Sequence, residues 1–296
     1  MYSHRSIRAT MKVGLHVSIA GGIDLAVDRA LARGCETFQM FTRNPRGWRF
    51  SELDEKAEVF RSKVANSKIE PVVVHMPYLP NLASPRQRIY KSSVKSLITE
   101  VKRCELLKAQ YLVVHLGSHL GSGSRPGSER IVNAVSDALS GASGSTTILL
   151  ENTSGSQNSM GSTFDEISDI LEKVGKAVNI CLDTCHAFAS GYDLRSDCAI
   201  EGTLGELEEQ IGLKRLKVIH VNDSKGALGS RLDRHEHIGL GKIGRKGFRC
   251  LLTHPKIRGI PLILETPIDG RRNDDGDMRV VRKLASIRSK TAMRFS

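Results

Sequence analysis

Short apolar segments recur along the whole chain, and each is bounded by residues that favour turns. Eight of them are rich in β-branched or other apolar side chains, and they begin about every 24 to 45 residues. Near-continuous apolar runs of this length are typical of strands buried on both faces of a parallel sheet. The predicted strands lie in KVGLHVS (12–18), ETFQMFTRN (36–44), PVVVHMPY (71–78), YLVVHLGS (111–118), TTILLENT (146–153), VNICLDTCH (178–186), LKVIHVND (216–223) and IPLILETP (260–267).

Amphipathic patterns of helical period lie between these strands. They are clearest at 23–34, 86–109, 128–139 and 163–177, whereas the Gly/Ser-rich stretches 117–128 and 140–146 read as loops. Eight strand–helix repeats predict an α/β fold, a single (β/α)₈ TIM barrel, with a helix following each parallel strand. We expect one domain over residues 11–288, an N-terminal extension at 1–10 and a basic tail at 289–296.

Six of the predicted strands change from apolar to His, Asp or Glu at their C-terminal ends. Each such residue alone is equally well explained as a hydrogen-bonded surface group. In a barrel, however, all six would converge on the face where barrel enzymes keep their chemistry. Packing imidazoles and carboxylates together is costly without cations between them, so the group indicates a metal site. The six residues are His75, His115, Glu151, Asp183, His220 and Glu265.

The segment SRLDRHEHIGLGKIG (230–244) adds more groups that bind protons or metals. Asp233, His235 and His237 alternate along it and would share a face if the segment is extended, but the spacing does not say which histidine binds. With His186, three residues after Asp183, and with Asp233 and His235, the candidate ligands number nine.

The number and type of these ligands limit the chemistry. A catalytic zinc ion uses about three protein ligands, so nine indicate two or three metal ions. Imidazole and carboxylate without thiolate favour Zn²⁺, with Mn²⁺ or Fe²⁺ as alternatives at some sites. Clusters of closely spaced divalent ions are characteristic of phosphoester hydrolysis.

Composition narrows the choice of partner and compartment. Lys+Arg number 44 against 32 Asp+Glu, for a net charge of +12, which suits a polyanionic partner but equally a merely basic protein. Six cysteines without a CxxC pair are typical of reduced thiols. No apolar run approaches the roughly 20 residues of a membrane span. We therefore expect a cytoplasmic protein with no membrane association.

Nine segments of the chain carry a family resemblance: GLHVSIAGG, FTRNPRGW, HMPYLPNLAS, HLGSHLG, LLENTSG, CLDTCHAFASGYD, HVNDSK, SRLDRHEHIGLGKIG and LILETP. In these segments the chain resembles the endonuclease IV family, metal-dependent apurinic/apyrimidinic endonucleases of DNA base-excision repair on a xylose-isomerase-like TIM barrel. The resemblance runs from about Met11 to Pro267, and it departs at Leu240, because some members carry Glu between the glycines that correspond to Gly239 and Gly241.

The resemblance implies three zinc ions per chain, held by the same nine residues. His75, His115 and Glu151 would hold the first ion. Glu151 would also bridge to a second ion, whose other ligands would be Asp183, His220 and Glu265. The ligands of the third ion would be His186, Asp233 and His235. Glu151 and Glu265 are the implied catalytic residues, Glu265 as a ligand that also orients or deprotonates water, and His237 is left to orient the loop or meet phosphate.

The implied activity is hydrolysis of the DNA phosphodiester 5′ to an abasic site, which leaves a 3′-hydroxyl and a 5′-deoxyribose phosphate. The implied substrate is double-stranded DNA with abasic sites or blocked 3′ ends. The resemblance places Arg46, Tyr78 and Leu79 at the positions that enter the DNA. We expect the protein to act as a monomer.

Two other classes of protein remain as alternatives. A metal-dependent sugar isomerase or epimerase of the xylose-isomerase-like barrels would share the fold, but it would need only one or two metal ions and a small polar pocket. A DNA-binding protein without catalysis would keep the basic surface, but it would have no need of nine ligands.

Overall fold

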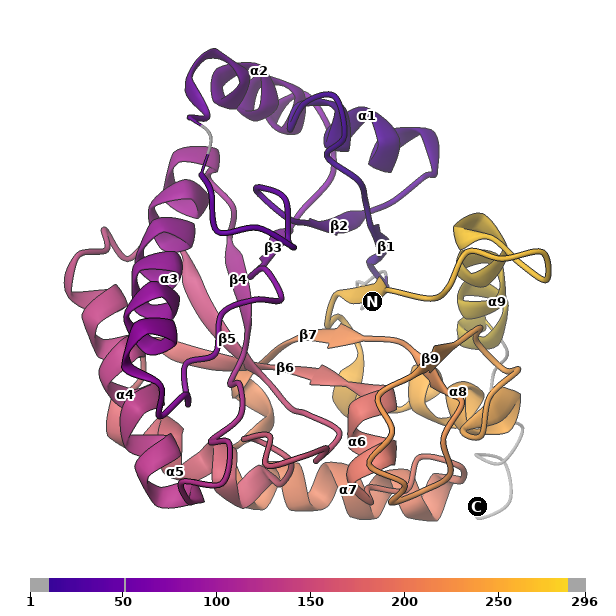
Figure 1. The fold of residues 1–296 in the computed structure, drawn as a ribbon. Helices are drawn as coiled ribbons and strands as arrows, with labels where there is room; N and C mark the ends of the chain where they lie inside the picture. Colours follow the sequence, from indigo (N-terminus) through magenta and orange to yellow (C-terminus); the bar gives the residue numbers. More distant parts are fainter. Residues whose placement is uncertain (1–10, 51, 287–296) are drawn as a thin grey trace, which may run out of the picture.

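The computed structural model of the chain describes residues 11–50 and 52–286, and its central feature is a closed barrel of eight parallel strands (Figure 1). The order β1-β10-β7-β6-β5-β4-β3-β2 brings the last barrel strand beside the first, which confirms the predicted TIM barrel. The predicted extension at 1–10 and basic tail at 289–296 lie outside the described residues. The barrel strands are β1 (Val13–His16), β2 (Thr37–Met40), β3 (Val72–His75), β4 (Tyr111–His115), β5 (Thr147–Glu151), β6 (Val178–Asp183), β7 (Leu216–His220) and β10 (Leu262–Leu264).

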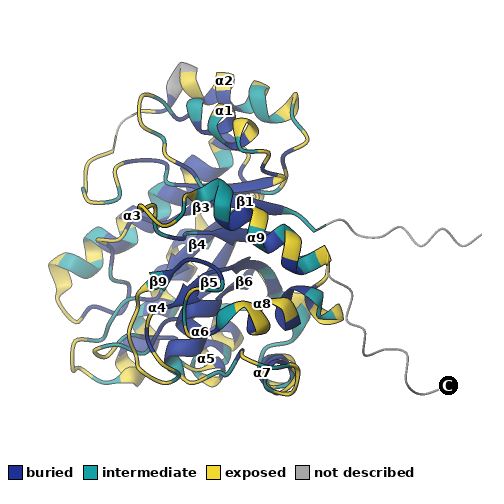
Figure 2. Cartoon of the chain, turned by 90° about the vertical axis from the view of Figure 1, so that its right-hand side faces the viewer, coloured by how far each residue is buried: buried dark blue, intermediate teal, exposed yellow. Residues whose placement is uncertain are grey.

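Helices surround the strands, with their buried residues turned inward and their exposed residues on the outside (Figures 1 and 2). Two helices follow β6, and the first of them begins directly at the end of the strand. The helices are α1 (Leu25–Ala32), α2 (Asp54–Ala65), α3 (Gln87–Leu107), α4 (Ser124–Ser140), α5 (Phe164–Val174), α6 (Thr184–Ser190), α7 (Asp197–Gln210), α8 (Gly244–Thr253) and α9 (Asp274–Ser286), with short 3₁₀ turns η1 (Leu213–Arg215) and η2 (Pro255–Ile257). Within the described ranges, no helix combines the length and the hydropathy needed to cross a membrane.

One predicted boundary is wrong. Helix α4 begins at Ser124, inside the Gly/Ser-rich stretch read as a loop and four residues before the predicted start at Ser128. Gly123, with a φ of 97°, turns the chain into the helix. Pro126 then falls in the first turn, where its missing N–H is not needed. The composition of the segment concealed a helix that starts with residues of low propensity.

The strands alternate between two apolar layers. Residues of one parity join the large core between barrel and helices, whereas those of the other parity fill the barrel interior. The interior set is Val73, Val113, Leu149, Cys181, Val218 and Ile263. Each member lies two positions before a candidate ligand, so the two-residue period of a strand points all six ligands into the mouth above this interior core.

A small antiparallel ladder follows β7. Strand β8 (Asp223–Ser224) pairs with β9 (His235–Glu236), and the backbone N–H of Lys225 donates to the carbonyl of Arg234 at 3.0 Å. The ladder closes the loop 225–234 at its base. It thereby holds the backbone extended at His235, which is the condition under which alternate residues of this segment share a face.

Candidate metal centre

The candidate ligands at the strand ends form one layer to which all eight barrel strands contribute. Neighbours within the layer are fixed by the register of the sheet, which pairs His115 with Glu151 and Asp183 with His220. The same layer contains two residues that the sequence prediction missed, His16 of β1 and Gln39 of β2, which are also register partners. Their position two residues after Gly14 and Thr37, on the inward parity, is the signal that could have identified them.

Glu151 is the centre of the cluster. Its Oε2 atom lies 3.2 Å from Nε2 of His75 and 3.1 Å from Nε2 of His115. Its Oε1 atom lies 3.0 Å from Nδ1 of His220. The two oxygens therefore face two different sets of histidines, an arrangement that allows one carboxylate to bridge two cations.

A second group forms around His220. Its Nδ1 atom lies 3.3 Å from Oε2 of Glu265 and 3.9 Å from Oδ2 of Asp183. Together with Glu151, these residues offer four ligand atoms that all lie within 4.8 Å of one another. Asn222 supports the group, since its Nδ2 donates to Oδ2 of Asp183 at 2.6 Å and its Oδ1 accepts from the backbone N–H of Glu265 at 2.9 Å.

A third group combines α6 with the loop after β7. Asp183 caps α6 by accepting the backbone N–H of His186 at 2.8 Å, which sets the side chain of His186 beside the strand ends. Nε2 of His186 lies 3.2 Å from Oδ1 of Asp233, and Nε2 of His235 lies 3.7 Å from the same oxygen. The Cys185 thiol is also near this group, but burial raises its pKa to about 12, so it is a poorer ligand than the imidazoles.

His237 lies outside these groups. Its Nδ1 is 2.6 Å from Oδ2 of Asp277 and its Nε2 is 3.0 Å from Oδ1 of Asp269, and the ring is fully buried. Both nitrogens are thus occupied by carboxylates that α9 and the preceding loop provide. Of the two roles left open for this residue, orienting the loop fits the contacts and meeting phosphate does not.

Backbone carbonyls orient three of the candidate histidines. A carbonyl only accepts, so the ring nitrogen beside it carries a hydrogen, and the other nitrogen is the one that can bind a metal at the centre. In each of these rings Nδ1 is the donor and Nε2 faces the carboxylates. The Nδ1 atom donates to the carbonyl of Met76 in His75, at 2.7 Å, to that of Asn152 in His186, at 3.0 Å, and to that of Glu265 in His235, at 3.2 Å.

The electrostatics of the cluster favour bound cations. Burial opposes ionisation of Glu151, but the neighbouring imidazoles of His115, His220 and His186 hold its pKa well below the usual range. Burial likewise opposes charge on His186, yet nearby carboxylates, Asp183 first among them, raise its pKa well above the ordinary value. Buried carboxylates that stay ionised, together with the unpartnered buried Nε2 of His235, fit divalent metal ions.

Two adjoining hollows open above the cluster, of about 450 Å³ and about 440 Å³. Both are lined by His115, His186, Asp233 and Tyr78. The second is otherwise lined mainly by uncharged polar residues of the loops after β3, β4 and β5, among them Asn81. The open space above the cluster therefore continues over the loops after β3, β4 and β5.

The three predicted DNA contacts gather at this mouth. The Tyr78 and Leu79 residues are 63% and 39% exposed, and Arg46 is exposed on the loop after β2. The two loops are joined, because the backbone N–H of Tyr78 donates to the carbonyl of Pro45 at 3.2 Å. An aromatic ring and an apolar side chain are thus presented to solvent beside the candidate metal ligands.

The glycine-rich part of the loop after β7 is held by one carboxylate. Oδ2 of Asp223 accepts the backbone N–H groups of Gly239 and Gly241 at 2.9 and 3.0 Å, and Oδ1 accepts those of Ser224 and Ile243 at 2.8 and 3.0 Å. Asp223 is fully buried. Since β8 carries Asp223 and β9 carries His235, this carboxylate fixes the segment that follows a candidate ligand.

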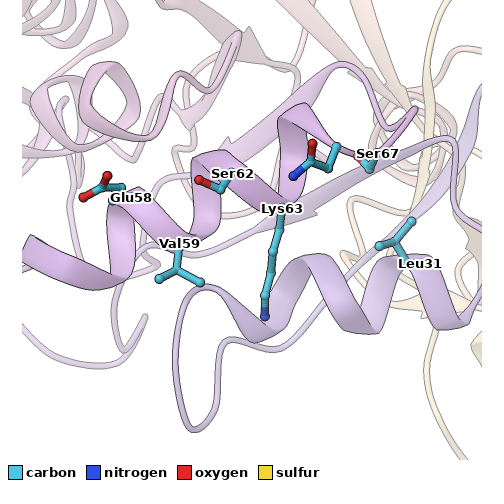
Figure 3. Close-up of a pocket in the computed structure, with 7 residues that line it drawn as sticks. Leu31, Glu58, Val59, Ser62, Lys63 and Ser67 are labelled. Atoms are coloured by element: carbon cyan, nitrogen blue, oxygen red, sulfur yellow. The ribbon is translucent and has the colours of Figure 1, made fainter.

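A separate hollow of about 570 Å³ lies on the outside of the barrel, between α1 and α2 (Figure 3). Among the described residues that line it there is no histidine or cysteine, and the one cation among them, Lys63, is paired with Asp24 and Asp28. The lining residues are Leu31, Glu58, Val59, Ser62, Lys63, Asn66 and Ser67. We assign no chemistry to this hollow.

Comparisons with known proteins agree on one family. Residues 27–289 match the family model described as xylose isomerase-like TIM barrel. The chain is 55% identical over 277 residues to a probable endonuclease 4 of Methanoculleus marisnigri, covering 92% of this chain and 98% of that protein. The crystal structure of endonuclease IV from Thermus thermophilus superposes with a TM-score of 0.82 at 37% identity, covering 92% of this chain and 98% of the other.

A likeness to sugar-metabolising barrels extends to the fold alone. A D-tagatose 3-epimerase-like protein superposes with a TM-score of 0.69 over 93% of this chain and 97% of the other, but at 18% identity.

Proposed function

The chain belongs to the endonuclease IV family of xylose isomerase-like TIM barrels, and on that premise we propose that it is an apurinic/apyrimidinic endonuclease of base-excision repair. It hydrolyses the DNA phosphodiester 5′ to an abasic site and leaves a 3′-hydroxyl and a 5′-deoxyribose phosphate. The observation that carries this proposal is the convergence of nine imidazole and carboxylate ligands in one barrel mouth. Sugar isomerases and epimerases share only the fold.

We assign three Zn²⁺ ions to the three groups, with Mn²⁺ or Fe²⁺ as alternatives at some sites. The chemistry of the ligands supports this assignment, because imidazole and carboxylate without thiolate suit borderline divalent ions. Glu151 belongs to the first and second groups, since its two oxygens face different histidines. The groups are His75, His115 and Glu151; Glu151, Asp183, His220 and Glu265; and His186, Asp233 and His235.

Bound metal ions would supply Lewis acidity for the attacking water and for the departing 3′ oxygen. The chain provides the orientation. The Glu265 side chain is 17% exposed and lines the mouth, whereas those of Glu151 and Asp183 are 1% and 0% exposed. Glu265 is therefore the carboxylate of the second group that can touch the attacking water, orient it and accept its proton, and Glu151 holds the two halves of the centre together.

Recognition of the lesion falls to the rim of the mouth. Enzymes that act on a buried nucleotide take it out of the stack, and inserted side chains occupy the gap. Tyr78 and Leu79 have the exposure and the position for a wedge, and Arg46 lies on the loop bonded to theirs. We assign these three residues to DNA binding.

The substrate is double-stranded DNA with abasic sites or blocked 3′ ends, bound by a monomer inside the cell with the genomic DNA. The net charge of +12 supports a polyanionic partner.

The deciding experiment is an incision assay on a duplex that carries a single abasic site. Zinc-loaded protein should cut the damaged strand once, on the 5′ side, and leave a 3′ end that a polymerase extends. Removal of the metal with a chelator should abolish the cut, and zinc should restore it. The undamaged duplex serves as the control, and failure of the zinc-loaded protein to cut the abasic duplex would refute the proposal.

A further inference from the structure

Gln39 occupies the ligand layer of the barrel without being a ligand. It is fully buried, and both ends of its side-chain amide are bonded. The Nε2 atom lies 2.6 Å from Oε1 of Glu265 and 3.0 Å from Nδ1 of His16, and the Oε1 atom lies 2.8 Å from Nε2 of His220. From β2, this side chain reaches residues at the ends of β1, β7 and β10.

The partners fix the orientation of the amide. The carboxylate of Glu265 accepts a hydrogen bond from the side chain of Gln39, and an ionised carboxylate has no hydrogen to donate. The atom 2.6 Å from it must then be the amide nitrogen, which leaves the amide oxygen facing His220. The second hydrogen of the nitrogen is available to Nδ1 of His16, and a flipped amide would place its oxygen against the carboxylate oxygen of Glu265.

The amide oxygen in turn fixes the proton on His220. An amide oxygen only accepts, so Nε2 of His220 carries a hydrogen whether the ring is neutral or charged. The nitrogen left for a metal is Nδ1, which lies 3.0 Å from Oε1 of Glu151 and 3.3 Å from Oε2 of Glu265.

We propose that Gln39 is a positioning residue of the metal centre. It directs His220 to bind through Nδ1, and it ties Oε1 of Glu265 so that Oε2 is the oxygen turned to the metal. The inference rests on the metal centre of the proposed function.

The other three oriented rings show why this residue matters. His75, His186 and His235 donate from Nδ1 to backbone carbonyls, which no substitution removes, and they face the centre with Nε2. His220 faces it with the opposite nitrogen and depends on a side chain. The second group is therefore the one whose geometry a single substitution in β2 can undo.

The first test uses the unmodified protein. In zinc-loaded protein with ¹⁵N-labelled histidine, NMR should show His220 with a hydrogen on Nε2 and a metal-shifted Nδ1, while the assigned rings of His75, His186 and His235 show the opposite pattern. A His220 ring that carries its hydrogen on Nδ1 would overturn the proposal, whatever the behaviour of any variant.

The second test compares two glutamines. Gln39→Leu removes the amide with little change in volume. Gln110→Leu is the matched control, because the side-chain amide of exposed Gln110 accepts the backbone N–H of Val72, at 2.6 Å, at the other end of the barrel. Gln39→Leu should bind one of its zinc ions about 10- to 100-fold more weakly in a chelator competition, with the other two unchanged. The control should match the parent.

The outcomes separate the two proposals. If the parent binds no zinc, the proposed metal centre itself fails. If the parent binds its full complement and Gln39→Leu binds every ion with parental affinity, only the role of Gln39 fails. Loss of one high-affinity zinc ion from Gln39→Leu alone supports it.

Discussion

Nδ1 of His237 lies 2.6 Å from Oδ2 of Asp277, a carboxylate of α9 that is itself fully buried. Asp277 also receives the backbone N–H of Ile238 at 3.0 Å and the guanidinium of Arg272 at 2.7 Å. His237 is thus bound into the contact between the loop and α9, although it stands only two residues after the candidate ligand His235.

This difference predicts opposite results for two neighbouring histidines. His235→Ala should purify with one metal ion fewer than the parent protein. Its activity should fall by more than the roughly 10- to 100-fold that is typical when a residue supporting a ligand is replaced. His237→Ala should keep its metal and part of its activity but lose about 1 to 3 kcal/mol of unfolding free energy, because the buried carboxylate of Asp277 loses one of its partners. Metal analysis and denaturant titration measure both quantities. Loss of the ion from His237→Ala and its retention in His235→Ala would reverse the assignment.

The affinity for zinc should depend on pH in a defined direction. Burial lowers the pKa of His186 and His220, but nearby acidic groups, Asp183 first for His186 and Cys181 first for His220, outweigh it and raise both pKa values, so in the metal-free protein these rings hold an extra proton to a higher pH than a free imidazole does. Zinc must displace these protons. Its apparent affinity should therefore rise with pH until the raised pKa values are passed, and level off above them.

Calorimetric zinc titrations at pH 7 in two buffers of different ionisation enthalpy should reveal the released protons. The same proton binding sets the direction in which the stability of the metal-free protein changes with pH. Stability from the charged rings is fully present below a pH of about 6.5 and is lost as pH rises through the folded pKa values. Identical heats in the two buffers would contradict the raised pKa values.

The wedge at the rim can be tested separately from the metal centre. Tyr78→Ala with Leu79→Ala should weaken binding to an abasic duplex about 10- to 100-fold, since each side chain loses apolar contact with the DNA. Metal content should not change. Leu31→Ala with Val59→Ala is the matched control, because these residues are 48% and 45% exposed in the hollow between α1 and α2. Unaltered binding and incision in the Tyr78/Leu79 variant would show that these two residues do not act as a wedge.

Binding to the duplex should also depend steeply on salt. If Lys and Arg neutralise several phosphates, the logarithm of the affinity falls linearly with the logarithm of the salt concentration, with a slope of about −0.9 for each phosphate contacted. Fluorescence anisotropy at several salt concentrations gives the slope. If the affinity of an active enzyme for the duplex did not change with salt concentration, neutralisation of phosphates by Lys and Arg would not contribute to binding.

Much of this molecule follows from local sequence, and what does not follow depends on contacts between distant residues. Apolar runs predicted the eight strands, and the polar residues at six strand ends predicted the mouth, because strand period and barrel topology leave those side chains one direction to point. Gln39 was not predicted, since TFQM reads as the interior of a strand and only the partners from β7 and β10 reveal the amide.

The spacing of His235 and His237 could not decide between them for the same reason, because the difference depends on contacts with distant residues. Alternation along the loop treats the two residues alike, and the carboxylates that bind His237 come from positions 269 and 277. Likewise the first turn of α4 has residues typical of a loop, and its helical start was missed.

The buried carboxylate of Asp223 has a further consequence for how the enzyme meets its substrate. Backbone amides of a glycine-rich turn at the start of a helix form a ready site for a phosphate. Here that site is filled from within, because Asp223 already accepts the amides of Gly239, Gly241 and Ile243. These amides are therefore not available to the phosphates of the DNA backbone, and side chains at the rim must bind the DNA instead. The loop that ends in these glycines therefore needs no incoming phosphate to take its shape, and it stands preorganised before the damaged strand arrives.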